Sequence, residues 1–123
     1  MNYLLILDDD RSIEKVKSLT PSDVFDDHPD RPIVLAKDFK EAQQYMVNSE
    51  HLCSHICFDH FLYSSKNHMD LTGLDFARWL SMYDERRTPL LTDDFSFSVH
   101  TTDEKANKQI FEQMKDHQDL KGI

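Results

Sequence analysis

The sequence is poor in the residues that mark disulfide-stabilised or membrane-embedded proteins. Only two of its 123 residues are cysteines, Cys53 and Cys57. So few cysteines, with no recognisable signal peptide, are typical of a reducing compartment, and we expect a cytoplasmic protein with both thiols buried as small hydrophobic groups. No apolar stretch approaches the roughly 18 residues of a membrane-spanning helix, so we expect no membrane partner.

Basic residues are also scarce, with 14 Lys and Arg against 23 Asp and Glu and a formal net charge of −9. Such a chain lacks the clustered positive charge that nonspecific DNA binding requires, although a nucleotide could still be bound through a metal ion. The negative charge could instead occupy a basic surface on a protein partner. The length predicts one domain, residues 1–123, and the 39% hydrophobic content is enough for a modest core.

The apolar pattern predicts strands that alternate with helices. Short apolar runs predict strands at 2–7, 32–36, 55–58 and 95–99. Helical spacing predicts helices at 12–19 and, after a capping Asp38, at 39–49. It predicts two further helices, one that starts at Thr72 and one that follows a capping Asp103. Tyr83 is expected on the inner face of the first of these two helices and Phe111 on the inner face of the second. Polar segments predict loops at 20–31, 60–71 and 84–94. This alternation implies a mainly parallel four-stranded sheet with right-handed crossovers.

Titratable residues directly follow three of the predicted strands. They are Asp8 and Asp9, Asp59 and His60, and His100 and Thr101. Parallel strands bring their carboxyl ends to one edge of a sheet, where ligands bind. If the three strands lie side by side, the carboxylates converge and repel one another unless a cation lies among them. The pattern therefore predicts a divalent metal and a ligand that carries phosphate.

The order of these features resembles a receiver domain, the flavodoxin-like fold of response regulators. That family has an acidic pair after its first strand, a phosphate-accepting Asp after its third and a Ser or Thr after its fourth. In this chain Asp8 and Asp9 match the acidic pair, Asp59 matches the phosphate acceptor and Thr101 matches the hydroxyl residue. The resemblance implies a three-layer α/β sandwich. The family's fifth strand and its Lys have no counterpart, because only residues 119–123 follow the last predicted helix. Phosphorelay signalling is therefore the third of our functional hypotheses.

Four motifs are more similar to a divergent receiver group, the cyclic-phosphate-processing receiver domains. In chain order they are Leu7-Asp8-Asp9-Asp10-Arg11, Phe58-Asp59-His60-Phe61-Leu62, Thr72-Gly73-Leu74-Asp75 and Val99-His100-Thr101. The chain departs from that pattern at Phe61, where the family often has a second Asp, and at Asp103, where an Asn is frequent. The resemblance covers nearly the whole chain and implies a site for a cyclic phosphate.

Acidic side chains are the predicted metal ligands. Asp8, Asp9 and Asp59 would hold Mg²⁺, or alternatively Mn²⁺, because Mg²⁺ is bound by a few carboxylates together with water and phosphate oxygens. Asp8 and Asp9 could instead form a solvated turn before the next helix, and Asp59 could accept a phosphoryl group as in a receiver.

His60 and His100 are the predicted catalytic residues, because an unperturbed pKa of about 6.5 suits a general acid or base near neutral pH. One would take a proton from water and the other would protonate the leaving oxygen of a cyclic phosphate. Alternatively, His60 makes a structural hydrogen bond and His100 binds the metal.

The predicted substrate-binding residues are Arg11, Thr101, Thr72 and Gly73. The guanidinium of Arg11 could hold a phosphate oxygen, or could form only a surface ion pair. Thr101 could bind phosphate or cap the following helix. Thr72 has Asp75 three residues later, the spacing of a capping box, and Gly73 is one of only two glycines in the chain, which favours close backbone approach to a ligand.

Two classes of function fit these residues. The first is a metal-assisted phosphoesterase that acts on a cyclic phosphate, either a 2′,3′-cyclic RNA end or a cyclic nucleotide. The second is a non-enzymatic receiver-like module that binds a nucleotide or a protein and regulates it, including an inhibitor of the phage type with an acidic surface.

Overall fold

The computed structural model describes residues 2–8, 13–20, 23–26, 29–58, 72–84, 88–99 and 104–121. Strands and helices alternate along the chain, apart from a second short helix before the second strand. The elements are β1 (Tyr3–Leu7), α1 (Ile13–Leu19), α2 (Asp23–Asp26), β2 (Ile33–Ala36), α3 (Phe39–Asn48), β3 (Cys53–Phe58), α4 (Gly73–Tyr83), β4 (Leu91–Val99) and α5 (Glu104–Lys121).

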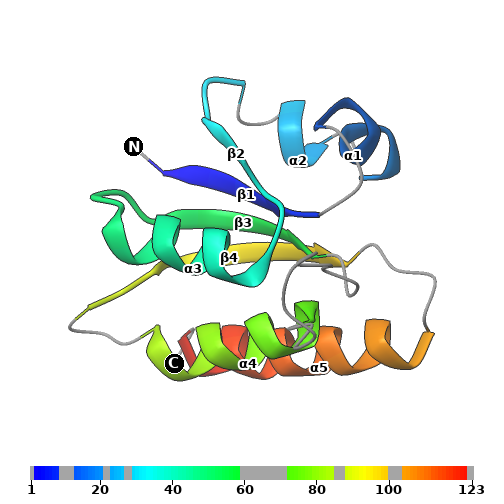
Figure 1. Cartoon of the computed structure of the whole chain (residues 1–123), viewed down its shortest axis with the longest axis vertical. Coiled ribbons are helices and arrows are strands. Elements are labelled where there is room, and N and C mark those ends of the chain that lie inside the picture. The colour runs from blue at the N-terminus through cyan, green and yellow to red at the C-terminus, as the bar shows by residue number, and fades with distance from the viewer. Residues whose placement is uncertain are drawn as a thin grey trace.

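The four strands form one parallel sheet in the order β2-β1-β3-β4 (Figure 1). This arrangement confirms the predicted flavodoxin-like α/β fold with a parallel four-stranded sheet. Every residue of β1 is buried, as expected for a strand with neighbours on both sides and helices on both faces. The strands β1, β3 and β4 lie side by side, so their carboxyl ends, which the three predicted site segments follow in the sequence, lie along the same edge of the sheet.

The two faces of the sheet are covered unequally. On one face, Leu5, Ile56 and Phe58 pack with buried residues of α3, α4 and α5 in the larger core cluster. On the other face, Leu4 and Ile6 pack against Val16 of α1 and partly buried residues of α2 in a cluster of four buried residues. Figure 1 shows α1 and α2 on one side of the sheet and α4 and α5 on the other. None of the described helices is both long and apolar enough to cross a membrane.

Two predicted loops contain regular structure. One turn of helix, α2, lies within the predicted loop 20–31, and β4 begins at Leu91 rather than at Phe95. The first residues of β4 were missed because Asp93 and Asp94 are exposed on an edge strand, where polar residues are tolerated. Leu91 is nevertheless buried and pairs with Cys53, which starts β3 two residues earlier than predicted.

Two aromatic residues predicted on inner helix faces are half exposed. Tyr83 is 55% exposed and Phe111 is 50% exposed. Each still packs on one aromatic neighbour: Tyr83 stacks on Trp79 with ring centroids 5.6 Å apart, and Phe111 meets Phe97 of the edge strand at 5.4 Å. Both residues therefore lie at the margin of the apolar stripe of their helix rather than at its centre.

Candidate functional site

The carboxyl ends of β1, β3 and β4 are aligned laterally. Leu7 pairs with Phe58, and Phe58 pairs with Val99, so the last residues of the three strands form one row across the sheet. In Figure 1 the arrowheads of these strands point to the same side of the molecule, toward which the first residues of α4 and α5 also lie. In the sequence, Asp8, Asp59 and His100 each follow the row by one peptide bond. The common site predicted from the sequence requires three adjacent strands, and β1, β3 and β4 meet this requirement.

Asp8 is the one predicted metal ligand within the described residues. Its backbone N–H donates to the carbonyl oxygen of Ala36 at 3.0 Å, which extends the ladder between β1 and β2 by one residue. The residue is only 2% exposed. Burial raises the pKa of the Cys57 thiol, and the negative charge of Asp8 adds to this rise. A buried carboxylate at the end of a central strand has the oxygen chemistry that Mg²⁺ binds, so Asp8 fits a metal-ligand role.

Thr72 and Gly73 form the start of α4. The Thr72 hydroxyl accepts from the Asp75 N–H at 3.2 Å, and the Asp75 carboxylate accepts from the Thr72 N–H at 2.8 Å, which confirms the predicted capping box. Gly73 is buried and has no positive φ, so its backbone is one that other residues also adopt. The structure thus gives Thr72 a capping role, and substrate binding by these two residues stays a prediction.

Replacing Thr72 by Ala should lower the free energy of unfolding by about 1 kcal/mol, because the Asp75 N–H at the start of α4 loses the hydroxyl oxygen that accepts its hydrogen bond. Urea denaturation monitored by circular dichroism would measure the change. Ser81→Ala in the same helix is the matched control, since the Ser81 hydroxyl donates to the Ala77 carbonyl oxygen of its own helix and caps neither end of it. Equal stability of the two variants would contradict a stabilising cap.

An aromatic cluster fixes the first turn of α4 over the end of β3. The ring of Phe76 lies 6.4 Å from that of Phe58, the last residue of β3, and 5.5 Å from that of Phe39 at the start of α3. Trp79 lies 5.4 Å from Phe76 on its other side. The N-terminus of α4 is therefore held at the carboxyl edge of the sheet by buried contacts.

The remaining predicted site residues lie outside the described part of the chain. These are Asp9, Arg11, Asp59, His60, His100 and Thr101. Among the residues that are described, no group of three or more His, Cys, Asp or Glu side chains is placed to hold a metal. Cys53 and Cys57 are both free and buried, as predicted.

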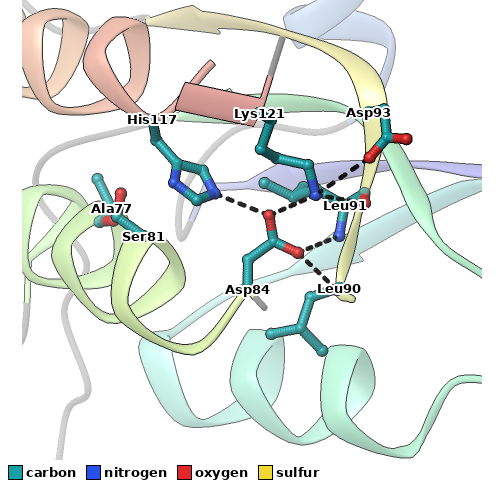
Figure 2. Close-up of polar contacts among 8 residues, drawn as sticks. All are labelled: Ala77, Ser81, Asp84, Leu90, Leu91, Asp93, His117 and Lys121. Atoms are coloured by element: carbon teal, nitrogen blue, oxygen red, sulfur yellow. Dashed lines mark hydrogen bonds and ion pairs between the residues drawn. The ribbon is translucent and has the colours of Figure 1, made fainter. Parts of the chain in front are cut away.

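A buried ionic network that the sequence did not reveal lies at the opposite, amino-terminal end of β4 (Figure 2). The Asp84 carboxylate accepts from His117 Nε2 at 2.7 Å and from Lys121 Nζ at 2.8 Å. Its other oxygen accepts from the backbone N–H groups of Leu90 and Leu91 at 2.8 and 3.0 Å. Asp84 also ends α4, so one side chain joins α4, β4 and the last turn of α5.

Burial alone raises the pKa of the Asp84 carboxyl, but the hydrogen bonds from His117, Lys121, Leu90 and Leu91 outweigh it and lower the pKa from 3.8 to about 2. No local pattern predicts this network, because Asp84 lies 33 residues before His117 in a segment rich in charge. It stabilises the fold far from the carboxyl edge and is separate from the candidate site.

The row of strand ends and the buried Asp8 define the class of protein as a receiver-like α/β domain. The family model for the cyclic-phosphate processing receiver domain matches residues 3–116. The chain therefore belongs to that family, and the resemblance drawn from the four motifs is confirmed. No curated protein sequence matches the chain.

Solved structures with a similar fold are response regulators. The chain is similar to the MaeR response regulator bound to beryllium trifluoride, with a TM-score of 0.53 and 18% identity over 87% of this chain and 72% of that one. A CheY-like receiver domain from Methanospirillum hungatei JF-1 gives a TM-score of 0.48 and 12% identity over 99% and 97% of the two chains. At these identities the likeness to MaeR shows the fold alone.

Proposed function

We propose that the protein is a metal-assisted phosphoesterase that acts on a cyclic phosphate, either a 2′,3′-cyclic RNA end or a cyclic nucleotide. The observation that carries the proposal is the lateral alignment of Leu7, Phe58 and Val99, whose successors in the sequence are Asp8, Asp59 and His100. Membership in a family described by cyclic-phosphate processing supports the same substrate class.

The carboxylates of Asp8, Asp9 and Asp59 would hold a divalent cation, most simply Mg²⁺. When bound, the cation supplies positive charge that offsets the charge on the phosphate. Buried Asp8 fits this group, because a carboxylate at a strand end supplies a hard oxygen ligand. The N-terminal ends of α4 and α5 lie toward this edge, and the positive ends of their dipoles also favour an anionic ligand (Figure 1).

His60 and His100 would move the protons of hydrolysis. One imidazole takes a proton from the attacking water as the new phosphorus–oxygen bond forms. The other gives a proton to the ring oxygen as its bond to phosphorus breaks, which leaves a phosphomonoester and a free hydroxyl. Arg11 and Thr101 would hold the phosphate oxygens that do not react.

The test is a hydrolysis assay with 2′,3′-cyclic nucleotides, 3′,5′-cyclic nucleotides and RNA that ends in a 2′,3′-cyclic phosphate, in Mg²⁺, in Mn²⁺ and in EDTA. We expect turnover of at least one substrate with metal, loss of turnover in EDTA and loss in folded His100→Ala. Lys108→Ala, on an exposed position of α5, is the control that should keep full turnover. Absence of turnover by the folded protein across the panel would refute the proposed phosphoesterase activity.

A second readout separates binding from catalysis. If Asp8, Asp9 and Asp59 converge, millimolar Mg²⁺ should raise the melting temperature of the wild type, because the cation relieves repulsion in the folded state. The rise should be absent in Asp59→Asn and present in His100→Ala. No effect of Mg²⁺ on the wild type would argue that the three carboxylates do not share a site.

The alternative is that the protein is a non-enzymatic receiver-like regulatory module. Such a module binds a nucleotide or a protein, and one form of it inhibits a basic partner. The net charge of −9 favours it, since a strongly negative surface is complementary to a basic one. A binding partner captured equally by the wild type and by His100→Ala, with capture lost at high salt, would support this function over the esterase.

A further inference from the structure

A histidine lies in the sheet away from the candidate site, bonded on both sides to serines. His55 of β3 is 2% exposed. Its Nδ1 lies 2.6 Å from the Ser96 hydroxyl, and its Nε2 lies 3.1 Å from the Ser98 hydroxyl, both on the neighbouring strand β4. A pair of bonds to both ring nitrogens fixes the orientation of the imidazole.

The direction of these hydrogen bonds follows from the contacts of the neighbouring Cys57 sulfur. The Thr20 hydroxyl donates to the carbonyl oxygen of Val16 at 2.8 Å, and a carbonyl can only accept. Thr20 is also hydrogen-bonded to the Cys57 sulfur, so this sulfur is held between Thr20 and Ser98.

The Ser98 hydroxyl donates to the Cys57 sulfur at 3.4 Å, so the oxygen of Ser98 is left to accept from His55 Nε2–H. A neutral imidazole with its proton on Nε2 has a lone pair on Nδ1. The Ser96 hydroxyl therefore donates to Nδ1. Ser96, His55 and Ser98 are thus arranged as a nucleophile, its general base and a third group that holds the base in the required tautomer.

Ser96 is exposed and lines a cavity of about 400 Å³ on the face of β3 and β4 that also carries His55. The other residues that line it are Asn2, Pro29, Asp30, Arg31, Ser54 and Asp94. The Arg31 guanidinium is held by the Ser54 hydroxyl at 3.0 Å and by the carbonyl oxygen of Val24, so it is a fixed positive charge in the wall. The carboxylates of Asp30 and Asp94 disfavour an anionic ligand.

We propose that Ser96 is a nucleophilic serine activated by His55, and that the cavity takes small uncharged carboxylic esters. In the reaction the Ser96 oxygen attacks the ester carbonyl carbon while its proton passes to His55 Nδ1. The bond from that carbon to the alcohol oxygen then breaks, and His55 returns the proton to the leaving alcohol. The products are acyl-Ser96 and an alcohol, and water releases the acid by the same steps. Ser98 is a positioning residue, because in the described part of the chain its hydroxyl bonds to the imidazole and to Cys57 and does not line the cavity.

The test is the rate of labelling by diisopropyl fluorophosphate, a neutral probe whose phosphorus–fluorine bond breaks as the serine oxygen bonds to phosphorus. Intact mass spectrometry should show one adduct, and peptide mapping should place it on Ser96. The adduct should be absent in Ser96→Ala and unchanged in Ser18→Ala, an exposed serine of α1 whose hydroxyl donates to the Lys15 carbonyl oxygen of its own helix. EDTA should not change the rate, which separates this site from the metal-assisted one.

Ser98 variants distinguish an activated serine from one that is merely accessible. Ser98→Ala should slow labelling roughly tenfold, less than the 10²–10⁴ of a positioned general base, because only the orientation of His55 is lost. Ser98→Thr retains the hydroxyl and should restore the rate. Absence of label on Ser96 in the folded protein, or an equal rate in Ser98→Ala and the wild type, would overturn the proposal.

Discussion

Replacing Asp84 by Ala should lower the free energy of unfolding by about 3–5 kcal/mol, the cost typical of breaking a buried ion pair from one side. The side chain of Asp84 is fully buried and accepts four hydrogen bonds, two from charged or titratable groups and two from the backbone. Without it, Lys121 and His117 keep their buried positions but lose their shared acceptor. The start of β4 also loses the acceptor for two N–H groups. Urea denaturation at pH 7 would measure the loss.

The matched control is Asp93→Asn, which removes a carboxylate from the same lysine. Asp93 is 97% exposed and lies 3.9 Å from Lys121 Nζ, so its removal should change stability by less than about 0.5 kcal/mol. Similar losses in the two variants would mean that stability depends on total charge near Lys121 rather than on the buried acceptor.

The same network should make the stability of the fold depend on pH in acid. The pKa of Asp84 falls from 3.8 to about 2 on folding, so the folded state favours the ionised carboxylate. Its contribution to stability is therefore fully present above about pH 4 and is lost as the pH falls toward 2. The difference in stability between wild type and Asp84→Ala should shrink over this interval, which acid titrations of the two proteins would show.

The architecture could be predicted because each strand of this sheet carries its own signal. The run Tyr3–Leu7 is apolar throughout because β1 is buried on both faces, and Thr72 with Asp75 marks the start of α4 locally. The start of β4 could not be predicted from its residues, because Asp93 and Asp94 suit an exposed edge as well as a loop. What makes Leu91 a strand residue is its pairing with Cys53, a contact between distant segments.

Side-chain networks were harder to predict than elements for the same reason. The pairs His117 with Asp84 and His55 with Ser96 join residues 33 and 41 positions apart, and neither pair has a characteristic spacing. The strand-end residues are easier to group than such networks, because the topology of a parallel sheet alone brings the carboxyl ends of its strands to one edge. That is why the sequence supports the prediction of a common site for Asp8, Asp59 and His100, which stays a prediction.

Replacing Phe76 by Ala should lower the free energy of unfolding by about 3–5 kcal/mol, since truncation of a buried Phe removes apolar contacts and leaves a cavity. Phe76 is fully buried between the rings of Phe39, Phe58 and Trp79. Chemical denaturation would measure the loss. Met82→Ala, on the exposed side of the same helix, is the control and should cost less than about 0.5 kcal/mol.

The Phe76→Ala substitution should also weaken the effect of Mg²⁺ at the candidate site. Phe76 packs on Phe58, the residue that precedes Asp59, so the Phe76 ring supports the position from which one predicted metal ligand leaves the sheet. In Phe76→Ala we expect a smaller rise in melting temperature with Mg²⁺ than in the wild type, and in Phe76→Leu, which keeps most of the apolar volume, a rise close to that of the wild type. An unchanged response in Phe76→Ala would show that the end of β3 is held without this ring.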